Sequence, residues 1–115
     1  MKLLTKELLK KLEAQDPYSP TGPGRELTKD EELVIAKFFT PDANWTWYAV
    51  SASPDPDTGD VQFFGLVDGL EVELGYFWLS ELQKVRGKLG LPVERDLYWE
   101  PVTLMSLMET LEHAA

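Results

Sequence analysis

The residue types that could do chemistry in this chain are almost all carboxylates, because its 115 residues include one histidine and no cysteine. A hydrolytic triad needs a nucleophile, a base and an orienting acid within hydrogen-bond reach. The single imidazole, His113, is close to the C-terminal end, where we expect a surface position and not a catalytic base. Paired-histidine and thiolate metal sites are excluded by the same counts. We therefore predict no catalytic residue, no metal ion and no cofactor, and the sequence does not point to an enzyme.

One group of carboxylates lies in the run Asp-Pro-Asp-Thr-Gly-Asp, which contains Asp55, Asp57 and Asp60. The run superficially resembles a calcium loop, but calcium takes six to eight oxygen ligands and only three carboxylates cluster here. Pro, Asp and Gly are also the residues expected in a tight turn. We therefore interpret the run as an acidic hairpin turn and not as a metal site.

A second charged group, Glu94-Arg95-Asp96, follows the predicted end of a helix. Two carboxylates can do general acid–base work if burial separates their pKa values. The structural interpretation, which we favour, is that Arg95 pairs with a carboxylate such as Glu73 or Glu81 and fixes this segment to the sheet.

The negative charge is concentrated in the middle of the chain. The net charge is −9, from 11 basic and 20 acidic residues, yet residues 1–37 hold equal numbers of each. Residues 38–83 contain no Lys or Arg and eight acidic residues, namely Asp42, Asp55, Asp57, Asp60, Asp68, Glu71, Glu73 and Glu81. This balance disfavours direct binding to a nucleic-acid backbone and docking on an anionic membrane. It fits either a solvated surface that aids solubility or a face that binds a basic protein.

The helices that position these groups follow from capping residues and hydrophobic periodicity. Thr5 predicts the N-cap of a helix over residues 6–14, and a stretch with several Pro and Gly predicts a mobile loop over residues 16–30. Ser80, with Gln83 three residues on, predicts a capping box for a second helix. Its apolar face is formed by Leu82, Val85 and Leu89.

Four runs rich in aromatic and β-branched residues predict strands over residues 33–39, 45–52, 61–67 and 71–78. Their connections are too short for parallel crossovers, so we predict an antiparallel meander. Residues 93–99 add a short edge strand, and an amphipathic last helix covers residues 103–113. The predicted fold is α+β: an antiparallel sheet of about four strands with an N-terminal helix, a helix after the sheet and a C-terminal helix, in a single domain over residues 1–115.

The Asp68-Gly69 pair predicts a two-residue hairpin turn between the last two strands of the meander. In that register one face is apolar and points to the core, pairing Val67 with Leu70, Gly65 with Val72, Phe63 with Leu74 and Val61 with Tyr76. The other face mixes apolar and acidic side chains, and it pairs Leu66 with Glu71 and Phe64 with Glu73.

The aromatic residues could form a stacking platform for bases or sugars, but no basic groove accompanies them. Strand alternation places Trp45 and Trp47 on one face and Tyr48 on the other. We expect most of the rings to belong to the core, with one or two exposed as anchors for a protein partner.

Several segments resemble one protein family over nearly the whole chain. They are Ala36-Lys37-Phe38-Phe39-Thr40-Pro41, Trp45-Thr46-Trp47-Tyr48, Phe63-Phe64-Gly65, Glu73-Leu74-Gly75-Tyr76-Phe77-Trp78-Leu79-Ser80-Glu81-Leu82 and Val85-Arg86-Gly87-Lys88-Leu89-Gly90-Leu91-Pro92-Val93-Glu94-Arg95-Asp96-Leu97. In these segments the chain is similar to an uncharacterised bacterial and phage family, domain of unknown function 2958. The resemblance implies an accessory role in a mobile genetic element, and it brings no established activity or catalytic residue.

We expect a cytoplasmic, non-enzymatic interaction module that binds a basic protein partner, as an anti-defence protein or a nucleic-acid mimic would. The candidate interaction face comprises Asp55, Asp57, Asp60, Phe64, Leu66, Glu71 and Glu73. The alternative is a small enzyme or ligand-binding domain that uses the polar cluster Glu81, Glu94, Arg95 and Asp96. A third possibility is a structural subunit whose interface is the apolar stripe of the last helix. The sequence leaves the partner and the oligomeric state open.

Overall fold

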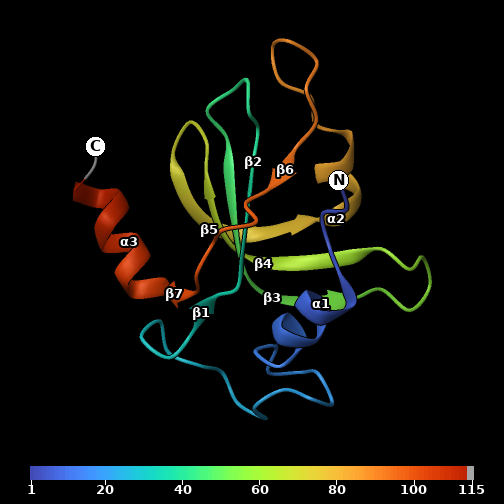
Figure 1. Ribbon diagram of the computed structural model, residues 1–115. Coiled ribbons are helices and arrows are strands. Elements are labelled where there is room, and N and C mark those ends of the chain that lie inside the picture. The colour runs from blue at the N-terminus through green and yellow to red at the C-terminus, as the bar shows by residue number, and fades with distance from the viewer. Residues whose placement is uncertain (114–115) are drawn as a thin grey trace.

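The structure, a computed structural model, describes residues 1–113 as an α+β fold (Figure 1). A five-stranded antiparallel sheet has the order β5 (Val72–Trp78), β4 (Val61–Asp68), β3 (Thr46–Pro54), β2 (Ala36–Phe39) and β6 (Glu94–Arg95). A two-stranded sheet joins β1 (Leu33–Val34) to β7 (Val102–Thr103), and the helices are α1 (Lys6–Glu13), α2 (Leu79–Lys84) and α3 (Leu104–His113). The predicted fold class is confirmed. The first predicted strand is divided at Ile35, and the predicted edge strand is the short β6.

The first helix begins where the sequence predicts. Thr5 Oγ1 accepts a hydrogen bond from the Leu8 amide at 3.2 Å, which satisfies one of the unpaired N–H groups of the first turn. Leu12 is fully buried, and Leu4 and Leu9 belong to the same apolar cluster, as a hydrophobic staple requires. These contacts hold α1 against one face of the sheet.

The five-stranded sheet carries an apolar layer on each of its faces. The first layer lies under α1 and α2, and its largest side chains are Trp47, Phe38, Phe63, Phe77, Leu12 and Leu82. The second layer lies under α3, and its buried residues are Val34, Tyr48, Val50, Leu66, Leu104 and Leu107. Met108 and Leu111 pack against this second layer, so the predicted apolar stripe of the last helix is confirmed.

A β-bulge in β3 decides which of its residues face each layer. Ala49 pairs with Gly65 and Ser51 pairs with Phe64, so Val50 is an extra residue between them. Ala49 and Ala52 both enter the layer under α1, although strict alternation would place them on opposite faces. The bulge thereby turns Ser51 and Ser53 toward the α3 side of the sheet.

The predicted two-residue hairpin at Asp68-Gly69 is wrong. Asp68 pairs with Val72, so the turn between β4 and β5 holds the three residues 69–71. A type I′ turn needs positive φ at both central residues, and neither Asp68 nor Gly69 has one. Gly69 serves a close approach instead, because a Cβ atom there would lie 2.2 Å from Cζ3 of the Trp45 ring.

This longer turn reverses the predicted faces of β5. Phe77 lies opposite Phe63 and enters the core, whereas the side chains predicted to do so are exposed: Val72 by 46%, Leu74 by 36% and Tyr76 by 69%. The predicted pairs of Leu66 with Glu71 and of Phe64 with Glu73 are replaced by Leu66–Leu74 and Phe64–Tyr76. The exposed face of β5 on the α3 side is therefore apolar.

The second helix is shorter than predicted and lacks the capping box. It begins at Leu79 after Trp78 and ends at Lys84. The Ser80 hydroxyl donates to Asp60 Oδ2 at 2.5 Å and does not cap the helix. Leu89, which we placed on the apolar face of this helix, lies beyond its end and is 81% exposed.

Candidate functional site

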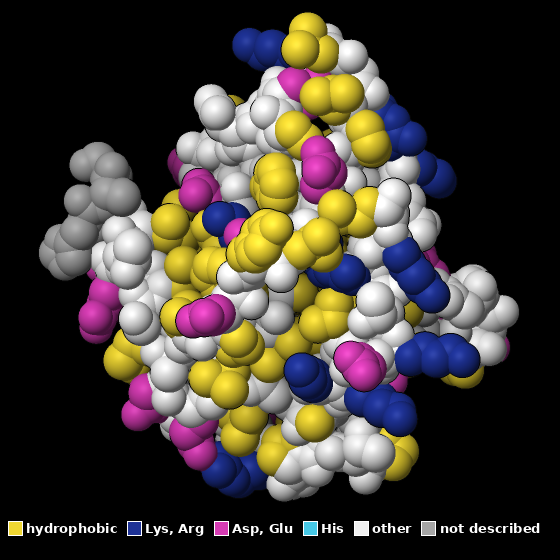
Figure 2. All heavy atoms as spheres, in the orientation of Figure 1, with side chains coloured by type: hydrophobic (Ala, Val, Ile, Leu, Met, Phe, Trp, Pro, Cys, Tyr) yellow, Lys and Arg dark blue, Asp and Glu magenta, His cyan; other side chains and the backbone are white. Residues whose placement is uncertain are grey.

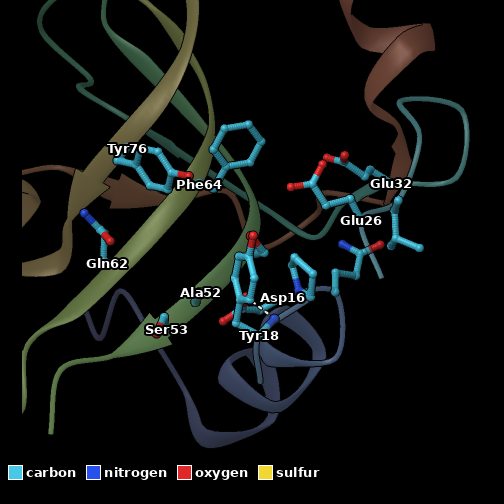
Figure 3. A pocket seen from close by; sticks show the side chains of 13 residues that line it. Asp16, Tyr18, Glu26, Glu32, Ala52, Ser53, Gln62, Phe64 and Tyr76 are labelled. Atoms are coloured by element: carbon cyan, nitrogen blue, oxygen red, sulfur yellow. Dashed lines mark hydrogen bonds between the residues drawn. The ribbon is translucent and has the colours of Figure 1, made fainter. Parts of the chain in front are cut away.

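A pocket of about 460 Å³ lies between the loop that follows α1 and the α3 side of the sheet. We call it the acidic pocket and define it by Asp16, Tyr18, Glu26, Glu32, Phe64 and Tyr76. Figure 3 shows Tyr76 and Phe64 on the sheet, Tyr18 and Asp16 below them, and Glu26 and Glu32 across the hollow. The residues that line it include three carboxylates and no Lys or Arg.

The loop wall of the acidic pocket is tied to the sheet by one side chain, Gln15. Its Nε2 donates to Leu33 O at 2.7 Å and to Val50 O at 2.6 Å, and its Oε1 accepts from Leu33 N at 2.8 Å. The carbonyl of Val50 is available for this contact because the bulge interrupts the β3–β4 ladder there. The loop that we predict to be mobile thus begins at a fixed point, and its mobility stays a prediction.

Arg25 precedes Glu26 of the acidic pocket in the sequence, but its guanidinium binds a residue outside the pocket. Arg25 donates to both carboxylate oxygens of Glu31, with Nη1–Oε1 and Nη2–Oε2 distances of 3.0 and 2.6 Å. This contact, together with hydrogen bonds from Thr28, lowers the pKa of Glu31 from 4.5 to about 2. The charge of Arg25 is therefore balanced by Glu31, which does not line the pocket.

Glu32 has an unsatisfied carboxylate at the wall of the acidic pocket. Its Oε2 atom is buried and accepts no hydrogen bond from any described residue. Burial raises the pKa of Glu32, and the carboxylate of Glu26 adds to this, while Lys29 opposes it. Figure 3 shows the carboxylates of Glu26 and Glu32 on the same side of the hollow. A cation placed between these groups would supply the missing partner.

Aromatic rings form the opposite wall of the acidic pocket. Phe64 and Tyr76 pack with their ring centroids 5.2 Å apart and their planes tilted by 58°. Tyr18 is exposed at the rim, where its backbone N–H donates to Asp16 Oδ1 at 3.0 Å. Ring faces beside carboxylates attract organic cations through the ring quadrupole and through charge.

The candidate interaction face predicted from the sequence is dispersed by the fold. Asp55 and Asp57 lie in the turn that precedes β4, whereas Glu71 lies in the turn that follows it. Glu73 lies opposite Val67, which packs with the layer under α1, so it faces away from Phe64.

Two further members of that predicted face make structural contacts inside the fold, one by packing in the core and one by hydrogen bonding. Leu66 is 1% exposed and packs in the layer under α3, so its prediction as a surface anchor is wrong. Asp60 accepts hydrogen bonds from Val61 N, Ser80 N and Ser80 Oγ, and the Ser80 hydroxyl is the main cause of its lowered pKa. Phe64 alone reaches the acidic pocket.

The polar cluster of the alternative hypothesis is brought together only in part. Glu94, Arg95 and Asp96 line a second, more open cavity of about 690 Å³, and neither Glu81 nor Glu73 lines it. The cavity also contains Lys37, whose Nζ is 4.0 Å from Asp96 Oδ2.

The predicted ion pair of Arg95 with Glu73 or Glu81 is absent from the described residues. Arg95 Nη1 donates to Leu3 O at 3.1 Å, which ties β6 to the N-terminal segment. The Asp96 amide donates to Lys37 O at 2.9 Å, so the segment after α2 is held to the sheet by contacts other than the one predicted.

The face of the molecule drawn in Figure 2 carries charges of opposite sign on its two sides. In the view of Figure 2 most Lys and Arg side chains lie on the right, over α1 and α2, and most Asp and Glu lie on the left. Hydrophobic side chains form an irregular band between them.

Within residues 1–113, no three His, Cys, Asp or Glu side chains are placed to hold a metal ion together. No helix in the same range is long and apolar enough to cross a membrane.

Sequence reasoning did not find five of the six residues of the acidic pocket: Asp16, Tyr18, Glu26, Glu32 and Tyr76. Asp16, Glu26 and Glu32 lie within residues 1–37, where basic and acidic residues are equal in number, so the net charge of that region does not reveal them. A signal was present in the exposed polar loop before β1, which carries Glu26 and Glu32 within a few residues of each other.

Comparison with known proteins identifies the family of the chain. Residues 3–115 match the family described as Protein of unknown function (DUF2958), and the chain belongs to it, which confirms the resemblance. No curated protein and no solved structure matches the chain.

Proposed function

We propose that this member of the DUF2958 family is a non-enzymatic interaction module that binds a basic protein, with the acidic pocket receiving a Lys or Arg side chain of the partner. The observation that carries the proposal is the composition of the pocket: three carboxylates and three aromatic rings, with no Lys or Arg in the lining. A partner's cation would complete this set of groups.

The chemistry of the pocket favours a cation over other ligands. The buried Oε2 of Glu32 lacks a donor, and a charge-assisted hydrogen bond from a guanidinium or ammonium group would satisfy it. The same cation would lie near the faces of Phe64 and Tyr76, which interact favourably with positive charge. An anion would meet repulsion from Asp16, Glu26 and Glu32.

The charge distribution supports the same proposal at longer range. Residues 38–83 contain eight acidic and no basic residues, so their field attracts a basic partner and raises its association rate. Inhibition of a nucleic-acid-binding protein, as by an anti-defence protein of a plasmid or phage in the bacterial cytoplasm, is the biological form of this proposal that the family resemblance suggests.

A small-ligand site at the second cavity is the alternative. It is favoured by one observation, namely that Glu94, Arg95 and Asp96 do line a common cavity with Lys37. Against it, both groups already make structural contacts, since Arg95 Nη1 donates to Leu3 O and Asp96 Oδ1 accepts from the Tyr98 amide.

The test is a calorimetric titration with acetyl-tetra-arginine amide, and with the tetra-citrulline peptide as a neutral probe of the same shape. We expect the arginine peptide to bind, to lose affinity at high salt, and to bind at least about tenfold more tightly than citrulline. The double variant Glu26→Gln, Glu32→Gln should lose about tenfold in affinity. The matched control is Glu7→Gln, Glu81→Gln, which removes the same charge from exposed positions of α1 and α2.

Two results would contradict the proposal. Equal affinity for the citrulline peptide would exclude recognition of charge. An equal loss of affinity in the pocket variant and in the control variant would exclude the acidic pocket as the place of binding and leave only a diffuse charge effect.

A further inference from the structure

The strand β5 is an open edge of the five-stranded sheet. It pairs with β4 on one side only, over the residues from Val72 to Trp78. Beyond that ladder, no backbone or side-chain hydrogen bond from the described residues reaches this strand. The other edge of the sheet, β6, is two residues long. An edge strand of seven residues leaves a row of N–H and C=O groups unpaired, and such a row can accept another strand.

The side chains of β5 are unlike those of a protected edge. Val72, Leu74 and Tyr76 form an exposed apolar row on the α3 side of the sheet, and Leu70 in the preceding turn is almost fully exposed. Glu73 faces the opposite side, and the nearest acid in the turn is Glu71. The strand therefore presents an exposed apolar row on one face of an unpaired backbone and the single carboxylate of Glu73 on the other.

We propose that a partner protein adds an extended segment to β5 as a sixth strand, and that this segment alternates apolar with basic residues. Its apolar side chains would extend the row formed by Val72, Leu74 and Tyr76, and its Lys or Arg side chains would lie beside Glu73. The inference rests on the proposed function for the sign of the partner's charge. The hydrogen-bonding edge and the apolar row determine the conformation of the bound segment.

Charge decides against a second copy of this chain as the occupant. A second copy would bring the Glu71 and Glu73 carboxylates of another β5 strand to the same edge, between molecules that each carry a net charge of −9. Charged residues on an edge strand oppose pairing of identical edges. A basic segment meets no such repulsion and gains from the lack of Lys and Arg in residues 38–83.

The position of Tyr76 joins this edge to the acidic pocket. Tyr76 belongs to the exposed row of β5 and also lines the pocket beside Phe64. A segment added along β5 therefore passes the mouth of the pocket. One of its ends can place a basic side chain near Glu26 and Glu32, so the two features fit one partner.

The test compares two heptapeptides of equal charge. The first is acetyl-Lys-Val-Lys-Val-Lys-Val-Lys-amide, and the second has proline in place of the central valine, which removes a backbone donor and disfavours an added strand. Binding is followed by nuclear magnetic resonance and by hydrogen exchange of the β5 amides. We expect the alternating peptide to bind about tenfold more tightly and to protect amides of β5.

A pair of variants locates the bound peptide. Leu74→Ser removes the centre of the apolar row, and Leu89→Ser removes an exposed leucine outside β5 as the matched control. Only the first should reduce binding of the alternating peptide. An equal effect of both variants would overturn the edge site.

The remaining outcomes separate this inference from the proposed function. If both peptides bind equally well, the addition of a strand is wrong while the basic partner stands. If tetra-arginine binds but neither heptapeptide does, the edge site again fails alone. If no basic peptide binds at all, both proposals fail. A dimer in light scattering that Leu74→Ser dissociates would identify a second copy as the occupant and overturn the basic segment.

Discussion

Two glycines that face each other across β4 and β5 provide a sharp test of the packing of the sheet. Gly65 and Gly75 are directly paired, yet their surroundings differ. A Cβ atom on Gly65 would lie 1.8 Å from the carbonyl oxygen of Tyr48 and 2.9 Å from its carbonyl carbon. A Cβ atom on Gly75 would have no heavy atom within 4 Å. The substitutions Gly65→Ala and Gly75→Ala each add one methyl group, the first to the β4 member of the pair and the second to the β5 member.

The expected magnitudes follow from these contacts. The atoms that a methyl group on Gly65 meets belong to the backbone of β3, so relief requires parting the β3–β4 ladder at the bulge. Overpacking of side chains costs about 1–3 kcal/mol, and a clash with backbone lies at the upper end or above, so we expect a loss of about 3–5 kcal/mol. Gly75→Ala should be neutral or stabilise the fold by about 0.5 kcal/mol, because alanine restricts the unfolded chain.

The assay is urea denaturation followed by tryptophan fluorescence, with far-ultraviolet circular dichroism as a second probe. With a denaturant dependence of about 1.5 kcal/mol/M, Gly65→Ala should lower the midpoint by about 2–3 M or prevent folding. Gly75→Ala should fold with a midpoint close to that of the parent. Loss of stability in Gly75→Ala as large as in Gly65→Ala, or a Gly65→Ala protein within about 0.5 kcal/mol of the parent, would refute the close approach of β3 to Gly65 and the open surroundings of Gly75.

Three further predictions concern the loop beside the pocket and the α3 layer. Gln15→Ala should lower the free energy of unfolding by about 2 kcal/mol in urea denaturation, because Leu33 N–H and two carbonyl groups lose their partner. It should also increase proteolysis after residue 16, and unchanged proteolysis would contradict the role of Gln15 as an anchor. The pKa of Glu31 is held at about 2 by Arg25, so its ionised form stabilises the fold above the unfolded-state value of 4.5, and this contribution is lost as the pH falls toward 2. Glu31→Gln should therefore flatten the decline of the urea midpoint between about pH 5 and pH 2, and an unchanged slope would exclude the ion pair. Trp99→Phe should cost about 1 kcal/mol, since the indole N–H donates to a backbone carbonyl of β1 at 2.9 Å, and denaturation of the variant at neutral pH measures it.

The local elements were predictable where a local cause produces them. Thr5 caps α1 because its hydroxyl reaches the amide of Leu8, a contact within one turn. The apolar stripe of α3 and the strand positions follow from residue period in the same way. Asp68-Gly69 misled the prediction because Asp68 continues β4 and Gly69 lies against the distant Trp45 ring, neither of which the local turn signal contains. Ser80 misled it likewise, because its hydroxyl is taken by Asp60 from twenty residues away.

An acidic candidate site was predictable from the sequence, but the residues that form it were not. The excess of acid over base suggests a cationic partner, and this stays a hypothesis, but the residues chosen from residues 38–83 are spread over both ends and both faces of the sheet. Of these, Phe64 alone lines the acidic pocket. Its carboxylates come from the neutral part of the chain, where the charge of Arg25 is cancelled by Glu31 and not by Glu26 or Glu32.

The amino-acid sequence by itself determined the α+β class, the helices at both ends, the antiparallel meander and the family, because period, capping and short connections act over a few residues. Only the tertiary structure decided which faces are open. One extra residue in the turn after β4 and one bulge at Val50 each shift a strand with a period of two, and such a shift exchanges buried and exposed side chains. The acidic pocket and the open edge at Tyr76 both depend on these shifts, and each shift is accompanied by a contact between residues far apart in the chain, Trp45 with Gly69 and Gln15 with Val50.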